Sequence, residues 1–266
     1  MATMSDTSNI GAAPGAAPIL RLRGIGRRFG GVRAVQGVDL EIRQGERRAV
    51  LGPNGAGKTT LFNVIAGEFP PSEGTVELFG VDVTRKPARA RVPLGVTRTY
   101  QISRLFHGLT VADNLYVSVI GAEGGHLRPV RNGRDRAFHE KAREIGAQVG
   151  LGEVLDDLVG TLSHGAQRQL EIGMALAGEP KLIMLDEPAA GLARAERVKL
   201  TEMLLGLDRS ITVILIEHDM DVALTVAEFV TMMHDGRVVV EGTPEEIRSN
   251  TMVHDLYLGR GGGHYE

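Results

Sequence analysis

The chain has 266 residues, of which 42% are hydrophobic and 24% charged, with a formal net charge of −3 at pH 7. This composition excludes a mostly disordered, collagen-like or coiled-coil chain, and the small net charge gives no sign of a nucleic-acid partner. The lack of cysteine excludes disulfides, thiolate metal sites and cysteine nucleophiles. No apolar run reaches the roughly 18 residues of a membrane-spanning helix, so we expect no spanning segment.

The chain begins with a segment that we expect to be a disordered tail. Residues 1–18 are small and polar, rich in Ala, Gly and Pro, and lack the basic start and apolar stretch of a secretory signal. From Ile19 onward, short apolar runs alternate with helical patterns. The runs that predict strands are Ile19–Arg23, Val35–Ile42, Arg48–Leu51, Thr75–Phe79, Val96–Tyr100, Leu182–Leu185, Ile211–Glu217 and Val230–His234. The pair Asp235-Gly236 is typical of a hairpin turn into a last strand, Arg237–Glu241.

The middle of the chain is almost entirely helical in pattern. Thr110 to Asp113 resembles a capping box with Asp in place of Glu, and residues 134–149 have one charged and one apolar face. The Gly- and Arg-rich residues 121–133 predict a loop. We therefore predict one α/β domain over residues 19–259, interrupted by a helical subdomain at about residues 104–165 and followed by a tail, 260–266.

A glycine-rich motif predicts a nucleoside-triphosphate site. Residues 52–59 read Gly-Pro-Asn-Gly-Ala-Gly-Lys-Thr, which matches G-x-x-x-x-G-K-[ST] between a predicted strand and a predicted helix. Glycines let backbone amides converge on phosphate oxygens, and the helix N-terminus adds partial positive charge. Lys58 supplies charge for the β- and γ-phosphates, and Thr59 coordinates Mg²⁺. The candidate nucleotide-binding residues here are Gly52, Pro53, Asn54, Gly55, Ala56, Gly57, Lys58, Thr59 and Thr60.

Two further strand ends carry candidate catalytic groups. The apolar run Leu182–Leu185 ends in Asp186 and Glu187, at the edge of an open α/β sheet where ligands collect. Asp186 is suited to hold Mg²⁺ through water, and Glu187 to polarise the attacking water. The neighbouring strand ends in His218, which we expect to contact the γ-phosphate.

Together with three other features, these residues resemble the ATP-binding subunit of an ABC transporter. Leu162-Ser-His-Gly-Ala166 lies where that family carries its Leu-Ser-Gly-Gly-Gln signature, Gln101 matches the glutamine that links Mg²⁺ and water to the helical subdomain, and Phe29 the aromatic residue that stacks on adenine. The resemblance covers about Ile19 to Gly259. It implies a P-loop ATPase fold with an N-terminal antiparallel β portion and an inserted helical subdomain. It also implies ATP and Mg²⁺ as ligands, Glu187, His218 and Gln101 as catalytic residues, and Thr59, Gln101 and Asp186 at the metal.

The signature suggests a site completed by a second subunit. Ser163 is a good N-cap, so the helix after it presents free amides and a hydroxyl to an anion. The family's head-to-tail dimer implies that Ser163 and Gly165 cover the ATP held by the other subunit. His164 and Ala166 depart from the signature, and Ala193 stands where the family often has Asp. These departures bear on the rate of hydrolysis.

Softer matches point to a subfamily. Segments such as 98–101, 170–173 and 216–220 resemble the importers of branched-chain and other hydrophobic amino acids, and the similar urea importers share Leu-Ser-His-Gly. Urea or a short-chain amide therefore remains an alternative cargo. The resemblance implies two membrane permeases, a second and different ATPase subunit forming a heterodimer, and a periplasmic binding protein. It places the chain at the cytoplasmic face of a bacterial inner membrane.

Two other classes of function remain as alternatives. A soluble ABC ATPase acting on nucleic acid or ribosomes fits less well, because roughly 105 residues between Lys58 and Ser163 leave no room for long coiled coils. A regulatory binder without activity is disfavoured by the intact Glu187. We expect permease contacts at Arg104, Leu105 and Phe106, which are as compatible with packing inside the subdomain.

Overall fold

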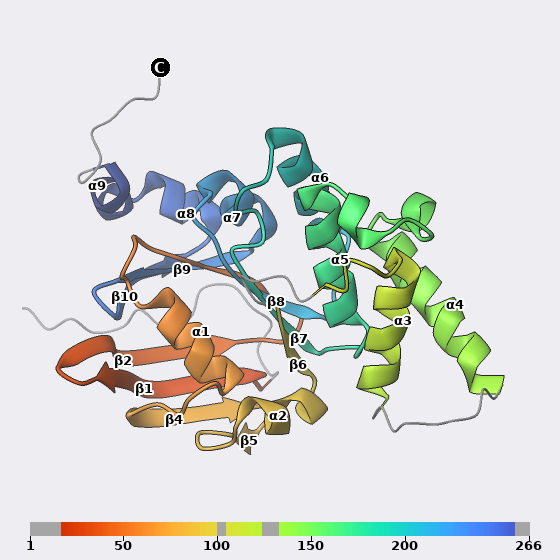
Figure 1. Cartoon of the computed structure of the whole chain (residues 1–266). Helices are drawn as coiled ribbons and strands as arrows, with labels where there is room; N and C mark the ends of the chain where they lie inside the picture. The colour runs from red at the N-terminus through yellow and green to blue at the C-terminus, as the bar shows by residue number, and fades with distance from the viewer. Residues whose placement is uncertain (1–16, 100–104, 124–132, 259–266) are drawn as a thin grey trace, which may run out of the picture.

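The structure, a computed structural model, describes residues 17–99, 105–123 and 133–258. The predictions made for residues 1–16, for Gln101 and Arg104, and for the C-terminal tail lie outside these ranges. Two β-sheets lie in the half of the molecule that contains α1, and helices α3 and α4 lie at the opposite end (Figure 1).

The smaller sheet is antiparallel and contains four strands in the order β2-β1-β4-β5. Its strands are β1 (Leu20–Phe29), β2 (Val32–Ile42), β4 (Glu73–Leu78) and β5 (Val81–Asp82). One hydrophobic cluster joins this sheet to the first long helix, α1 (Lys58–Ala66), through buried side chains such as Leu22, Phe62 and Ile65. The sheet therefore supports the helix that follows the predicted phosphate loop.

Strands β1 and β2 are longer than the sequence predicted. The first strand was predicted to end at Arg23, but register shifts between Leu22 and Arg28 keep β1 paired with β2 through Phe29. Gly24 adopts a φ of 58°, a left-handed conformation at one of these irregularities. The two strands thus form a long hairpin whose turn lies next to Phe29.

The larger sheet is mostly parallel, in the order β10-β9-β3-β8-β7-β6. Its strands are β3 (Arg47–Leu51), β6 (Val96–Arg98), β7 (Leu182–Asp186), β8 (Thr212–Ile216), β9 (Phe229–His234) and β10 (Arg237–Gly242), the last antiparallel to β9. Every residue of β3, β7 and β8 is buried, and the apolar runs at residues 49–51, 182–185 and 213–216 lie at the centre of the sheet. Their carboxyl ends lie at one edge of the sheet and carry the predicted site residues.

Helices cover the larger sheet and form the helical part of the chain. Beside α1, they are α2 (Ala88–Arg91), α3 (Val111–Ala122), α4 (Gly133–Gln148), α5 (His164–Leu176), α6 (Arg194–Leu205), α7 (Met220–Val226), α8 (Pro244–Ser249) and α9 (Thr251–Leu258). Leu115, Val149 and Leu170 belong to one buried cluster that joins α3, the end of α4 and α5. No helix within the described ranges has the length and apolarity to cross a bilayer.

The start of α3 differs in detail from the predicted capping box. The Thr110 hydroxyl accepts a hydrogen bond from the Asp113 amide at 3.1 Å, as expected for an N-cap. The Asp113 carboxylate accepts from the Thr110 hydroxyl at 2.7 Å instead of from its backbone amide, because Asp is one methylene shorter than Glu. The helix also continues through Ala122, so the predicted loop begins later than Gly121.

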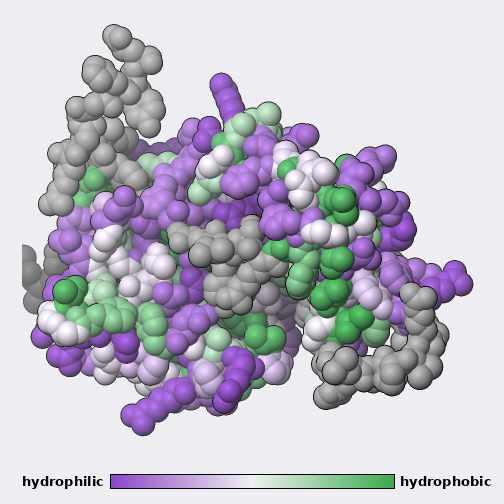
Figure 2. Space-filling view, in the orientation of Figure 1, coloured by the Kyte–Doolittle hydropathy of each residue, from purple (hydrophilic) through white to green (hydrophobic). Residues whose placement is uncertain are grey.

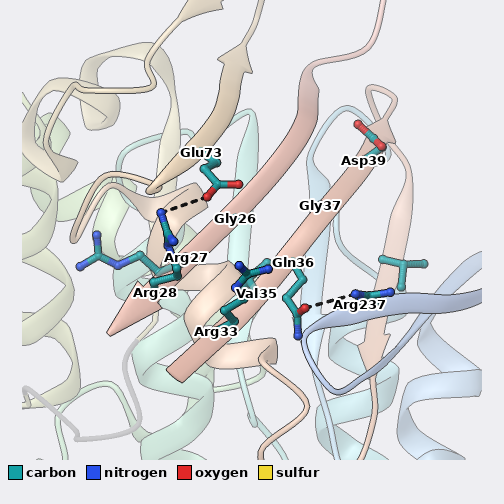
Figure 3. A pocket seen from close by; sticks show the side chains of 11 residues that line it. Gly26, Arg27, Arg28, Arg33, Val35, Gln36, Gly37, Asp39, Glu73 and Arg237 are labelled. Atoms are coloured by element: carbon teal, nitrogen blue, oxygen red, sulfur yellow. Dashed lines mark hydrogen bonds and ion pairs between the residues drawn. The ribbon is translucent and has the colours of Figure 1, made fainter. Parts of the chain in front are cut away.

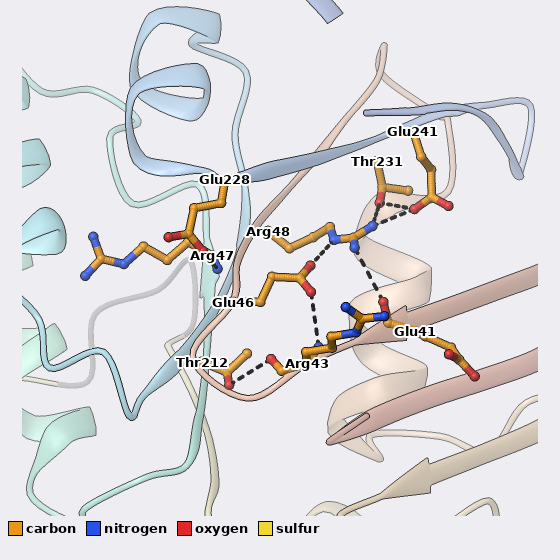
Figure 4. Close-up of polar contacts among 9 residues, drawn as sticks. All are labelled: Glu41, Arg43, Glu46, Arg47, Arg48, Thr212, Glu228, Thr231 and Glu241. Atoms are coloured by element: carbon orange, nitrogen blue, oxygen red, sulfur yellow. Dashed lines mark hydrogen bonds and ion pairs between the residues drawn. The ribbon is translucent and has the colours of Figure 1, made fainter. Parts of the chain in front are cut away.

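A buried arginine connects the two sheets (Figure 4). Arg48 on β3 donates to Glu46 at 2.6 Å and, through its other nitrogens, to Glu241 on β10 at 2.6 Å and to the Glu41 carbonyl on β2 at 3.4 Å. The Thr231 hydroxyl on β9 accepts a further bond from Arg48 at 3.0 Å. This network fixes the base of β3 and therefore the position of the loop at its other end.

Candidate active site

The predicted phosphate loop lies between β3 and α1. Helix α1 begins after Gly57, which has a φ of 96°, and it has no side-chain cap and no acidic residue in its first turn. Its first amides are therefore left for an external anion. Asn54, Gly55 and Thr59 are exposed, whereas Ala56 is buried. These free amides are compatible with the phosphate cradle predicted for residues 52–60.

Close packing behind the loop requires two of its glycines. A Cβ atom at Gly52 would lie 2.2 Å from the Met233 carbonyl oxygen, and one at Gly57 would lie 2.3 Å from the Ala34 carbonyl oxygen. The turn between β9 and β10 also holds the loop, because the Gly236 amide donates to the Ala56 carbonyl at 3.1 Å. The loop is therefore held from behind by segments from both ends of the chain.

Lys58 is the buried cation of this loop. The residue is 5% exposed, and its ammonium group donates to the carbonyls of Gly52 at 2.6 Å and Pro53 at 3.1 Å. Burial lowers the pKa of Lys58, while the charges of Glu187 and Asp186 act in the opposite direction. The phosphate loop and the two acidic residues are therefore close enough for their charges to interact.

Asp186 ends β7 and is buried with only one of its oxygens paired. Its Oδ2 accepts from Arg98 at 2.7 Å, and Arg98 also donates to Asn63 on α1 at 2.5 Å. The buried Oδ1 has no hydrogen-bond partner among the described residues. An unpaired buried carboxylate oxygen is costly unless a cation or its water shell neutralises it. This oxygen fits the hard, oxygen-seeking Mg²⁺ that the sequence predicted.

Glu187 and His218 meet at the edge of the sheet. Glu187 Oε1 lies 2.7 Å from His218 Nε2, and the Glu187 amide donates to the Ile216 carbonyl at 2.9 Å. Glu187 has a φ of 50°, a left-handed conformation that non-glycine residues rarely adopt. This conformation aims its carboxylate at the imidazole on the neighbouring strand. A carboxylate and an imidazole in contact can orient and deprotonate a water molecule.

Phe29 lies at the end of β1, and the residue is 44% exposed. Its centroid lies 5.4 Å from that of Phe69 in an edge-to-face arrangement, and the Arg27 guanidinium lies 4.6 Å from both centroids. The pair holds the ring in a fixed orientation while part of its surface stays open. This placement is compatible with stacking on a base.

Ser163 and Gly165 do not reach the phosphate loop of their own chain through any hydrogen bond between described residues. Ser163 caps α5, accepting from the Ala166 amide at 3.3 Å. Both Ser163 and Gly165 donate to Glu196 Oε1 of α6, at 2.8 and 2.9 Å. A Cβ atom on Gly165 would lie 2.8 to 2.9 Å from Glu196 atoms, so the missing side chain makes room for this carboxylate. The anion-binding end of α5 thus holds an internal anion.

Arg98, Glu196 and Glu217 contribute to the site but were not among the predicted site residues. Each left a signal in the sequence. Arg98 lies within the predicted strand Val96–Tyr100, Glu217 ends the predicted strand Ile211–Glu217, and Glu196 occupies the third position of α6 as in a capping box. Ala193 replaces the usual Ser or Thr of such a box, and only its amide bonds to Glu196, at 3.1 Å.

A separate hollow of about 520 Å³ lies beside the β1–β2 hairpin and β10 (Figure 3). Arginine side chains dominate it, and three of them are already engaged. Arg27 donates to the Pro70 carbonyl at 2.9 Å, Arg28 pairs with Glu73 at 3.2 Å, and Arg237 donates to Gln36 at 3.3 Å. None of its lining residues belongs to the phosphate loop. The hollow is therefore distinct from the arrangement around Lys58.

Comparisons with known proteins place this arrangement in context. Residues 35–190 match the family described as ABC transporter. The chain is 37% identical over 254 residues to the high-affinity branched-chain amino acid transport ATP-binding protein BraF of Pseudomonas aeruginosa, covering 91% of this chain and 98% of the relative. The ADP conformation of MJ1267, an ATP-binding cassette of an ABC transporter, superposes with a TM-score of 0.81 at 30% identity, covering 91% of this chain and 99% of that structure. The dimeric structure of MJ0796, a bacterial ABC transporter cassette, gives 0.71 at 25% identity and covers 85% and 98%.

Proposed function

Because the chain belongs to the ABC transporter family of ATP-binding proteins, we propose that it energises an importer of branched-chain or other hydrophobic amino acids. The family and the fold class predicted from the sequence are confirmed, as is the assignment as an ATP-hydrolysing subunit. The observation that carries the proposal is the convergence of Lys58, Asp186 and the Glu187–His218 pair at one edge of the sheet.

Each group at this edge has a role in hydrolysis. The amides of residues 54–57 and the start of α1 bind the phosphates, with Lys58 turning from its own loop carbonyls toward the β- and γ-phosphates. Phe29 stacks on adenine, and Pro53, Asn54 and Thr60 complete the cradle. Glu187 accepts a proton from the attacking water, while His218 orients Glu187 and contacts the γ-phosphate.

Thr59 and Asp186 would hold Mg²⁺, together with Gln101. Bound there, the ion would supply positive charge that neutralises the phosphate oxygens during transfer. The unpaired Oδ1 of Asp186 supports this assignment, since it faces no other described partner. The Arg98 contact keeps the other oxygen of Asp186 fixed, so the unpaired one has a defined direction.

A second ATPase subunit completes the site in this proposal. Family membership implies dimerisation and permease partners; the finer assignment is a head-to-tail heterodimer in which Ser163 and Gly165 cover the partner's ATP. The support is that both residues donate to an anion, Glu196, and that none of their bonds leads to their own phosphate loop. The γ-phosphate would take the place of the Glu196 carboxylate.

The helical part of the chain offers a docking surface for a permease. Exposed apolar side chains gather there (Figure 2), with Phe106 51% exposed. Leu109, Val117 and Leu158 are exposed as well, and the Leu109 carbonyl accepts from the amide next to Leu158 at 3.0 Å. Leu105, predicted as a contact, is buried in the helical core and packs there instead. We assign this surface to the subdomain at about residues 104–165 within a domain spanning 19–259.

The proposed setting is the cytoplasmic face of a bacterial inner membrane, with two permeases and a periplasmic binding protein. The cargo does not touch this chain, so the phosphate site is the same whatever is carried. The similarity to BraF supports branched-chain amino acids. Urea or a short-chain amide remains the alternative, on the Leu162–Gly165 motif.

A transport assay tests the proposal. The chain would be co-expressed with the permeases and binding protein from its gene neighbourhood and reconstituted in vesicles with ATP inside. We expect ATP-dependent uptake of radiolabelled leucine, and no uptake when Glu187→Gln replaces the wild type. Uptake of urea without leucine would select the alternative cargo, and co-sedimentation with ribosomes or DNA without permeases would contradict an importer.

A further inference from the structure

Glu217 is a buried acid that the proposed hydrolysis does not use. It follows β8 directly and is 2% exposed. Its Oε1 accepts from the Ala189 amide at 2.7 Å, and its Oε2 accepts from the His218 amide at 3.2 Å. Burial raises the pKa of this group to about 7, although amide donors oppose the shift. Burying a carboxyl group is energetically unfavourable, so we examined which backbone groups it binds.

The two amides belong to the two catalytic segments. Ala189 lies two residues after Glu187, in the loop that follows β7, and His218 is the imidazole in contact with Glu187. One side chain therefore holds both the loop that carries the carboxylate and the backbone that carries the imidazole. The distance between the Ala189 and His218 amides is bridged by a single carboxyl group.

The loop needs such an anchor because it begins with a strained residue. Glu187 is left-handed, with a φ of 50°, a backbone conformation that is unfavourable for a non-glycine residue. The bond from its amide to the Ile216 carbonyl holds the near side of the loop at 2.9 Å. Glu217 holds the far side at Ala189. Without that second anchor, the loop is free to relax and turn the Glu187 carboxylate away.

We propose that Glu217 is a positioning residue, which fixes the 2.7 Å contact between Glu187 and His218 by binding the backbone on both sides of it. The inference rests on the proposed function, since it assigns Glu217 to the water-activating pair of that reaction. Glu217 does not touch the phosphate loop, so it acts on the chemical step and not on the affinity for ATP.

Two substitutions at this position, with a matched control, test the inference. Glu217→Ala removes both acceptors, and we expect kcat to fall by about 10- to 100-fold while the Kd for ATP stays within about twofold. Glu217→Gln keeps one carbonyl oxygen for the Ala189 amide, and we expect it to restore a measurable part of kcat. The control is Thr212→Val, at the other end of β8, where the buried hydroxyl accepts from the Gly45 amide at 2.9 Å.

We expect Thr212→Val to lower the melting temperature as Glu217→Ala does, yet to keep kcat within about twofold. The inference is overturned if Glu217→Ala keeps the wild-type kcat, if kcat and ATP affinity fall together, or if the control loses as much kcat. If Glu217→Ala does not fold, a crystal structure of Glu217→Gln tests the inference instead. We expect a longer Glu187–His218 contact in this variant, and an unchanged contact would contradict the inference. A failure of the proposed function can be distinguished from a failure of this inference, because in that case the wild-type assembly itself would not hydrolyse ATP.

Discussion

Arg98 and Asp186 form a buried ion pair beneath the site, with Arg98 Nη2 2.7 Å from Asp186 Oδ2. The pair connects two neighbouring strands, since β6 ends at Arg98 and β7 at Asp186. Arg98 also reaches Asn63 on α1, so the guanidinium joins the helix after the phosphate loop to the acidic strand end. The arrangement orients the one carboxylate oxygen that we assign to Mg²⁺.

Replacing Arg98 with Met should leave Asp186 buried without its cation. We expect the free energy of unfolding to fall by about 3–5 kcal/mol, measured by urea denaturation. Arg136→Met provides the control, because Arg136 forms an exposed pair with Glu140 and its loss should cost no more than about 0.5 kcal/mol. If the two variants have the same free energy of unfolding, the buried Arg98–Asp186 pair contributes no more to stability than the exposed Arg136–Glu140 pair.

Glu187→Gln should abolish turnover while preserving ATP binding. The amide cannot accept the proton of the attacking water, so we expect the rate of phosphate release to fall by at least about 100-fold. Gel filtration with ATP should then show a stable dimer with its second subunit. Glu144→Gln, an exposed acid on α4, is the control. A rate for Glu187→Gln within about twofold of wild type would exclude Glu187 as the base.

Lys58→Ala should weaken nucleotide binding itself. The variant loses the cation that faces the phosphates, and calorimetry should show a Kd for ATP at least about 10-fold higher. Exposed Lys199 on α6 serves as the control, and Lys199→Ala should bind ATP as the wild type does. Unchanged affinity in Lys58→Ala would contradict the assignment of residues 52–59 as the phosphate loop.

The stability of the fold should depend on pH through Glu217. Burial raises its pKa from 4.5 to about 7, so between these values the folded protein holds more protons than the unfolded chain. The free energy of unfolding should therefore fall as the pH rises through this window, by about 3 kcal/mol in total. Urea unfolding from about pH 5 to about pH 7 should show that the free energy of unfolding of Glu217→Gln declines less steeply than that of the wild type. If the free energy of unfolding has the same pH dependence in both proteins, Glu217 is not the group that takes up the proton.

Much of this site could be predicted because its chemistry depends on local sequence. The phosphate loop, Asp186 and Glu187 each follow a buried apolar run, and parallel strands bring such ends to one edge. The contact between Glu187 and His218 follows from the same rule, since β7 and β8 are neighbours. The presence of the strands and the order of the motifs could therefore be predicted from the sequence, whereas the residues at which the strands end could not.

The remaining features depend on tertiary contacts that no local pattern reveals. Glu196 is ordinary as the third residue of a helix, and only the structure brings it to Ser163 and Gly165. Leu105 was expected as a permease contact with packing as the alternative, and only the structure shows that it is buried, because the sequence of an irregular segment does not indicate which side chains face inward. The length of β1 was missed because register shifts let the strand continue past Gly24 to Phe29, and no local pattern shows such shifts.

The contact between the phosphate loop and the turn after β9 has a consequence for biosynthesis. The loop is complete at Thr59, but the Gly236 amide that holds Ala56 is encoded roughly 180 residues later. At about 5–20 residues per second, a ribosome extends the nascent chain for about 10–40 s between these two points. A polypeptide released early, for instance after α6, would carry an intact nucleotide motif on an unfinished scaffold, so the motif alone gives such a fragment no firm hold on ATP.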